Sequence, residues 1–107
     1  MTVKICSEGD IEVGSAVRVV IDGTPIAVVK DSAGTIHAIG DTCTHGDISL
    51  AEGFVEDDTL ECWAHGSKFS LLTGKPLTLP AYEPVPVFAV TVVDGEVFID
   101  PTPVVAG

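Results

Sequence analysis

The chain has 107 residues, 16 of them acidic and 5 basic, which gives a formal net charge of −11 at pH 7. This length fits one domain with its own hydrophobic core, and 46% hydrophobic against 20% charged residues excludes a disordered acidic tail. The scarcity of Lys and Arg argues against nucleic acid or anionic membrane as a partner, because these side chains bind phosphate. No apolar run approaches the roughly 20 residues of a membrane span, and no signal peptide is visible, so we expect a cytoplasmic protein.

Short β-strands dominate the predicted structure. After a first strand that contains Cys6, runs rich in Val and Ile predict strands at 17–21 and 26–30, which flank an Asp-Gly turn typical of a tight hairpin. A strand at 35–39 follows, and a second Asp-Gly turn joins strands at 87–93 and 96–100. Residues 101–107 are expected to be loosely held.

The middle of the chain lacks helical periodicity. The best local candidate for a helix, 47–56, contains Gly53 and little amphipathic order. We therefore predict an all-β fold, an antiparallel sandwich or barrel that forms a single domain over 1–107. Residues 41–82, approximately, are predicted to be a loop-rich excursion from this β base.

Two Cys–His pairs lie in the excursion. One residue separates Cys43 from His45, two residues separate Cys62 from His65, and sixteen residues lie between the pairs. A glycine follows each His, which lets the backbone turn sharply beside an inorganic centre. Two thiolates and two imidazoles suit an iron–sulfur cluster or zinc.

These two loops carry a resemblance to a known family. Cys43-Thr44-His45-Gly46 and Cys62-Trp63-Ala64-His65-Gly66-Ser67, followed by Phe69 and Gly74, resemble the two cluster-binding loops of Rieske proteins. The chain is similar over nearly its whole length to the small Rieske-type ferredoxins of bacterial aromatic-ring-hydroxylating dioxygenase systems. The similarity includes the proline-rich stretch 79–86.

The resemblance implies a Rieske fold and a Rieske-type [2Fe–2S] cluster. Cys43 and Cys62 would bind the inner iron, and His45 and His65 would bind the outer, solvent-facing iron. The implied function is that of a soluble electron carrier, not an enzyme, which passes single electrons from an NAD(P)H-dependent flavin reductase to a terminal Rieske oxygenase. We expect a monomer, because a carrier must leave one face free for two partners in turn. The alternative function is the small Rieske-like subunit of an NAD(P)H-dependent nitrite reductase.

Zinc is the alternative metal, because it accepts two Cys and two His tetrahedrally and stabilises small folds. Against zinc, the single residue between Cys43 and His45 is tighter than the usual zinc-finger spacing. Zinc also leaves the glycine after each His unexplained.

The ligands and their neighbours predict a reduction potential. His ligation raises the potential of a [2Fe–2S] cluster to about −150 to +300 mV, against about −400 mV for plant-type ferredoxins. High-potential respiratory Rieske proteins have an additional Cys pair where this chain has Ile48 and Ala64. They also have Ser and Tyr hydroxyls near the cluster, where this chain has Ser67 and Phe69. We therefore predict the low end of the range, roughly −150 mV.

Four further features have less specific interpretations. Cys6 is predicted to be a buried structural thiol, and His37 a surface or half-buried residue rather than a fifth ligand. Trp63 is either exposed for partner docking or a shield of the cluster from water. The segment 41–61 has no Lys or Arg and forms either a solvated surface or a region that steers basic partners; its acids are Asp41, Asp47, Glu52, Glu56, Asp57, Asp58 and Glu61.

Overall fold

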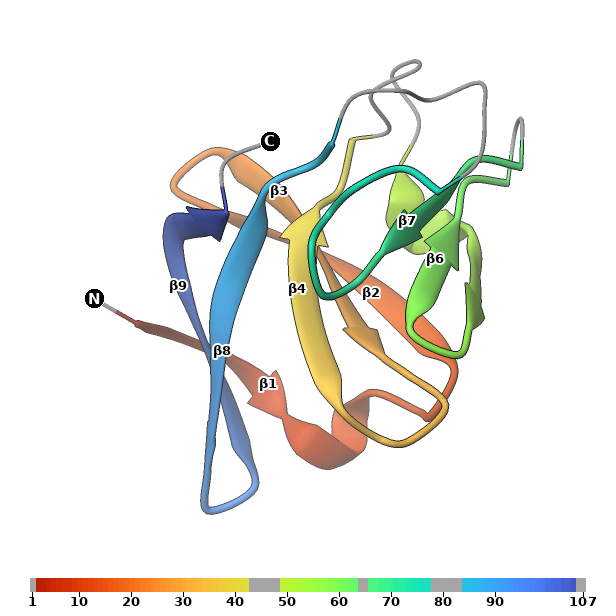
Figure 1. The fold of residues 1–107 in the computed structure, drawn as a ribbon. Coiled ribbons are helices and arrows are strands. Elements are labelled where there is room, and N and C mark those ends of the chain that lie inside the picture. The colour runs from red at the N-terminus through yellow and green to blue at the C-terminus, as the bar shows by residue number, and fades with distance from the viewer. Residues whose placement is uncertain (1, 43–48, 64–65, 78–83, 106–107) are drawn as a thin grey trace.

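The structure, a computed structural model, describes residues 2–42, 49–63, 66–77 and 84–105, with the backbone alone for 101–105 (Figure 1). The elements in chain order are β1 (Val3–Ser7), the 3₁₀ helix η1 (Glu8–Asp10), β2 (Ser15–Ile21), β3 (Thr24–Lys30), β4 (Ile36–Gly40), the 3₁₀ helix η2 (Leu50–Glu52), β5 (Phe54–Glu56), β6 (Thr59–Glu61), β7 (Lys68–Ser70), β8 (Val87–Val93) and β9 (Glu96–Val105). The all-β prediction is confirmed. Within the described ranges, no helix has the length and apolar character that crossing a bilayer requires.

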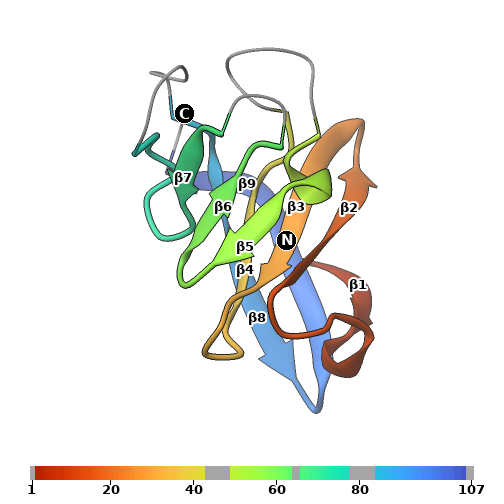
Figure 2. The same cartoon turned by 90° about the vertical axis from the view of Figure 1, so that its right-hand side faces the viewer.

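The strands form two antiparallel sheets. The larger has six strands in the order β1-β9-β8-β4-β3-β2, and the smaller has three in the order β5-β6-β7. Figures 1 and 2 show the small sheet packed beside the large one, next to β4 and β2. The small sheet falls inside the segment 41–82 that was predicted to leave the β base.

Both predicted Asp-Gly hairpins are present. Asp22 and Gly23 have φ angles of 50° and 80°, and Asp94 and Gly95 have φ angles of 51° and 76°. Two successive positive φ angles define a type I′ turn, whose twist matches that of the flanking strands. The first turn is so short that β3 begins directly after Gly23.

The prediction of a loosely held tail was wrong for residues 101–105. Strand β9 continues to Val105, and its last residues pair with the start of β8, Val87 with Val105 and Phe88 with Pro103. The register shifts between Phe88 and Val90, and a bulge of this kind tolerates proline in a strand. The tail was expected to be loose because terminal residues usually are, and pairing with β8 is what holds it.

Strands β3 and β4 form a wall between two hydrophobic cores. Ile26 and Val28 of β3 face one core, within the six-stranded sheet, while Ala27 and Val29 face a second core shared with the small sheet. Successive side chains of a strand point to opposite faces, so burial on both sides requires the continuous apolar run of β3. The second core includes Leu50, Leu60, Cys62, Phe69, Leu71 and Val85.

Candidate metal centre

The predicted ligands follow the ends of two strands. Cys43 and His45 come after β4, and Cys62 and His65 come after β6. The ends of β4 and β6 and the beginning of β8 lie at the same end of the molecule (Figure 1). Of the four ligands, Cys62 is described; Cys43, His45 and His65 lie outside the described residues, as do Ile48 and Ala64.

Cys62 begins a tight turn between β6 and β7. Its backbone N–H donates to the carbonyl oxygen of Ser67 at 2.7 Å, and its own carbonyl oxygen accepts from the N–H of Gly66 at 2.9 Å. Gly66 has φ +75°, a left-handed conformation that favours glycine. The Cys62 side chain is fully buried in the second core and is not in a disulfide. Its thiol is therefore kept from water at the base of the loop that carries His65.

The base of the first loop is closed by Asp41. Its carboxylate accepts hydrogen bonds from Ser49 and Ala51, and Thr42 and Ser49 form a β-bridge, so the chain returns to the point where it left β4. Asp41 is only 2% exposed, which corrects the interpretation of the whole acidic run as solvated surface. Glu52, Glu56, Asp57 and Asp58 are exposed as expected. Asp41 differs because its carboxylate is used internally.

Gly53 brings the two loops together. Its N–H donates to the carbonyl oxygen of Leu50 at 2.9 Å. A Cβ atom at this position would lie 1.9 Å from the carbonyl oxygen of Glu61 and 3.2 Å from that of Leu50. The exit of the first loop thus lies directly against the residue that precedes Cys62. This role was not predicted, because Gly53 belongs to no distinguishing motif.

A second close contact joins the small sheet to the segment before β8. The N–H of Val85 donates to the carbonyl oxygen of Gly74 at 2.8 Å. The N–H of Gly40 donates to the carbonyl oxygen of Pro86, also at 2.8 Å. Gly40 is the last residue of β4, so residues 84–86 connect both sides of the site. Residues 79–83 of the proline-rich stretch lie outside the described residues.

Two of the four residues used to predict the potential are described, and both are buried. Ser67 and Phe69 have no exposed surface, and Phe69 packs in the same core group as Cys62. The burial of both side chains leaves the predicted low potential untested.

Trp63 is 51% exposed, although it follows the buried Cys62 directly. This exposure favours the docking interpretation over that of a shield. The nearby outer face of the small sheet also bears the exposed Phe54 and Glu56. Lys68 on this face approaches two acids, Glu56 at 3.5 Å and Glu61 at 4.0 Å.

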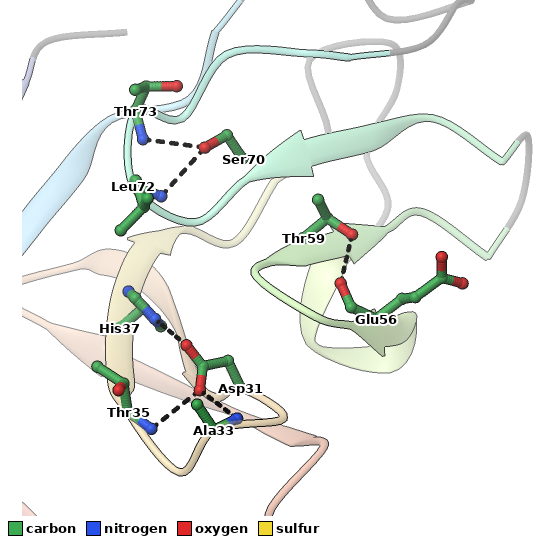
Figure 3. Close-up of polar contacts among 9 residues, drawn as sticks. All are labelled: Asp31, Ala33, Thr35, His37, Glu56, Thr59, Ser70, Leu72 and Thr73. Atoms are coloured by element: carbon green, nitrogen blue, oxygen red, sulfur yellow. Dashed lines mark hydrogen bonds and ion pairs between the residues drawn. The ribbon is translucent and has the colours of Figure 1, made fainter.

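His37 binds an acid rather than a metal (Figure 3). Its Nε2 lies 2.7 Å from Oδ2 of Asp31, whose Oδ1 accepts from the N–H groups of Ala33 and Thr35 at 2.9 Å. Burial raises the pKa of the Asp31 carboxyl, but the hydrogen bonds from His37, Thr35 and Ala33 outweigh burial and leave the pKa below its usual value. The group stabilises the Asp31–Gly34 turn next to the small sheet, where Ser32 N–H donates to the Asp57 carbonyl oxygen.

Cys6 lies in β1, as predicted, but it is half-buried rather than buried and is not in a disulfide. Burial and, to a smaller extent, the negative charge of Asp10 raise the pKa of its thiol. A thiol with a raised pKa is a poor nucleophile at neutral pH. Cys6 therefore remains a packing residue beside the core of the large sheet.

The described part of the site fits an iron–sulfur cluster. Cys62 offers a buried thiol, and thiolates are the residues that hold such clusters. Within the described ranges, no three His, Cys, Asp or Glu side chains gather to hold a metal ion. The other three residues of the predicted donor set, Cys43, His45 and His65, lie outside the described residues.

Comparisons with known proteins agree with this arrangement. The Rieske [2Fe-2S] domain family matches residues 1–89. The 3-phenylpropionate/cinnamic acid dioxygenase ferredoxin subunit of Escherichia coli (strain K12) is 43% identical over 96 residues, 89% of each chain.

Two solved structures are similar throughout. One is a chain in the complex of reduced oxygenase and oxidized ferredoxin in carbazole 1,9a-dioxygenase, with 38% identity, a TM-score of 0.89 and coverage of 95% of this chain and 94% of that one. The other, a putative NADH-dependent nitrite reductase small subunit from Mycobacterium tuberculosis, has a TM-score of 0.87 over 97% of both chains, but its 22% identity shows the fold alone. The family match supports an iron–sulfur cluster and leaves zinc without support. This chain belongs to the Rieske [2Fe-2S] domain family and has a Rieske-type cluster and the fold of the dioxygenase ferredoxins.

Proposed function

We propose that this protein is the electron-carrying ferredoxin of an aromatic-ring-hydroxylating dioxygenase. It takes single electrons from an NAD(P)H-dependent flavin reductase and delivers them to a terminal Rieske oxygenase. The observation that carries the proposal is the 43% identity to a dioxygenase ferredoxin subunit over 89% of both chains. The buried thiol of Cys62, whose backbone N–H donates to Ser67, independently supports the cluster that such a carrier needs.

The proposed ligands are Cys43 and Cys62 for the inner iron and His45 and His65 for the outer iron. When bound, the cluster accepts one electron and gives it up again. The chain's own contribution is to exclude water around Cys62 and to present a partner surface beside it. Trp63 provides an exposed aromatic contact next to the ligand Cys62, as is common where proteins meet.

The acidic surface is proposed to guide the encounter with both partners. Glu52, Glu56, Asp57 and Asp58 are all exposed on or near the small sheet. A surface of one sign attracts basic patches at long range and accelerates transient association. This proposal also includes a flavin reductase as the electron donor, a cytoplasmic location, a monomeric state and a single domain over 1–107. The alternative function, a nitrite reductase small subunit, is supported only by the similarity of fold.

Electron paramagnetic resonance of the dithionite-reduced protein tests the ligand set. We expect two irons, two labile sulfides and a rhombic signal with an average g value below that of the free electron. The variants Cys62→Ser and His65→Gln should lose this signal. The matched controls Cys6→Ser and His37→Gln should keep it, because Cys6 and His37 lie in β1 and β4 outside the two loops.

A second assay tests the role as a carrier. The cluster-loaded protein is mixed with NADH and the reductase component of a dioxygenase, and bleaching of its visible absorption is followed. An oxygenase component with its aromatic substrate and O₂ should then restore the absorption. If the reduced protein is not reoxidised by any dioxygenase component but is reoxidised by a nitrite reductase, the alternative function replaces the proposed one.

A further inference from the structure

The carboxylate of Asp41 occupies an unusual position for an acid in a chain of net charge −11. It is 2% exposed and all its oxygens have partners. Oδ1 accepts from the Ser49 hydroxyl and the Ala51 N–H, both at 2.9 Å, and Oδ2 accepts from Nε of Arg18 at 3.1 Å. A buried carboxylate needs such partners, because desolvation of an unpaired charge is costly.

The backbone of Asp41 is held as firmly as its side chain. Its N–H donates to the carbonyl oxygen of Pro25 at 3.1 Å, and its carbonyl oxygen accepts from the N–H of Leu50 at 2.6 Å. Asp41 therefore connects three parts of the molecule, the β2–β3 hairpin, the end of β4 and the start of η2. The chain leaves this point at Thr42 and returns to it at Ser49, as their β-bridge shows.

Arg18 connects the same point to β2 of the six-stranded sheet. It lies in the middle of β2, paired with Ala27 of β3, and 53% of its side chain is exposed. Arg18 is one of only five basic residues in the chain. Its guanidinium supplies the charged partner for the Asp41 carboxylate, whose other hydrogen bonds come from neutral groups.

We propose that the Asp41–Arg18 pair is a positioning device for the first ligand loop and tunes the metal centre through it. The pair sets where the loop begins and ends, and so it sets the orientation of Cys43 and His45, two and four residues after Asp41. This inference rests on the proposed ligand set. Asp41 and Arg18 are positioning residues: they act through the loop, and neither is a ligand.

The test is Arg18→Met, with Lys4→Met as its matched control. Lys4 forms an ion pair with Glu96 at 3.0 Å, close to the 3.1 Å of the Arg18 pair, and the two cations are equally exposed, at 53%. The Lys4 pair joins β1 to β9, away from both ligand loops. Both variants remove one surface cation, and the effect on the net charge therefore cancels in the comparison.

Two readouts on the cluster-loaded protein report the loop directly. Pulsed electron paramagnetic resonance measures the nitrogen couplings of the two coordinated imidazoles, and loss of visible absorption in the presence of an iron chelator measures cluster release. In Arg18→Met we expect altered couplings and about tenfold faster release, matching the lower end of the loss of metal affinity that removal of a ligand's supporting residue causes. Arg18→Lys should recover part of both, and Lys4→Met should match the unmodified protein.

Asp41→Asn provides a second variant. The amide oxygen can still accept from Ser49 and Ala51, but its NH₂ group faces the Arg18 donor, so the link to β2 breaks selectively. We expect the same spectral change as in Arg18→Met, and no further change in the double variant. If Asp41→Asn does not fold, Arg18→Met still decides the question.

The outcomes separate the two proposals. An unmodified protein without imidazole couplings would overturn the ligand set. A normal unmodified spectrum, with Arg18→Met equal to Lys4→Met in both couplings and release rate, would overturn the positioning role and leave the ligand set intact.

Discussion

Replacement of Gly74 by Ala tests how the segment after β7 is attached to the segment that leads into β8 of the six-stranded sheet. Gly74 has φ +73°, and a Cβ atom there would lie 2.1 Å from the carbonyl oxygen of Val85. Gly95 offers a matched control, because it has φ +76° and no atom within 4 Å of the same position. The two substitutions therefore share the cost of a left-handed alanine and differ in the clash.

The expected magnitudes follow from these distances. A left-handed conformation costs a residue other than glycine about 1–2 kcal/mol, and reduced entropy of the unfolded chain returns about 0.4–1 kcal/mol, so Gly95→Ala should cost about 1 kcal/mol. In Gly74→Ala, relief of the clash requires a shift of roughly 1 Å and breaks the Val85–Gly74 hydrogen bond of 2.8 Å. The lost bond and the unsatisfied groups add about 2–4 kcal/mol.

Thermal unfolding of the cluster-loaded proteins, followed by circular dichroism, measures the difference. At about 4 °C per kcal/mol for a domain of this size, the midpoint should fall by about 4 °C for Gly95→Ala and by about 12 °C or more for Gly74→Ala. Cluster loss makes unfolding irreversible, so the midpoints must be compared at one scan rate. Equal decreases in the two variants would refute the argument that close approach to Val85 is what requires glycine at position 74.

Three further predictions concern pH, potential and salt. Asp31→Asn should cost about 1–3 kcal/mol at neutral pH. Burial raises the pKa of Asp31 but its hydrogen bonds lower it further, so its contribution is present above the unfolded pKa of about 3.9 and is lost as the pH falls through the lower folded pKa. The difference in melting temperature between the variant and the unmodified protein should therefore narrow as the pH falls below about 5, and a constant difference would contradict this account. Phe69→Tyr should raise the reduction potential from roughly −150 mV by about 60–130 mV, since a hydrogen bond to a charged group is worth about 1.5–3 kcal/mol. Voltammetry measures this shift, and an unchanged or lower potential would show that the tyrosine hydroxyl does not reach the cluster. The rate of electron transfer to a partner should fall as ionic strength rises from about 0.01 M to 0.5 M, because the Debye length shrinks well below 10 Å; stopped-flow rates independent of salt would exclude steering by the acidic surface.

Much of the fold was predictable because its determinants are local. Alternating and continuous runs of Val and Ile identified the central strands, and each Asp-Gly pair adopts positive φ angles that produce a type I′ turn. The predicted strand 87–93 coincides with β8. The extension of β9 to Val105 was missed, because a β-bulge opposite Phe88 depends on pairing with another strand and leaves no pattern in the tail itself.

The ligand motif is likewise a property of the sequence. Cys and His at these spacings, each pair followed by glycine, are enough to indicate the family, because metal binding selects residue types that few other roles require. Cys62 is described and its side chain is buried, but the ligand role of all four residues stays a prediction.

What tertiary structure alone decided is how the loops are supported. Asp41 belonged by sequence to a run of solvated acids, yet it is buried because Arg18, 23 positions earlier, and Ser49 come to its carboxylate. Gly53 and Gly74 looked like ordinary loop glycines, and only packing against Glu61 and Val85 shows why a side chain is excluded there. The chemistry of the site depends on residue type and short spacing, which a sequence displays directly. Its support depends on contacts between distant segments, which exist only once the two sheets have packed together.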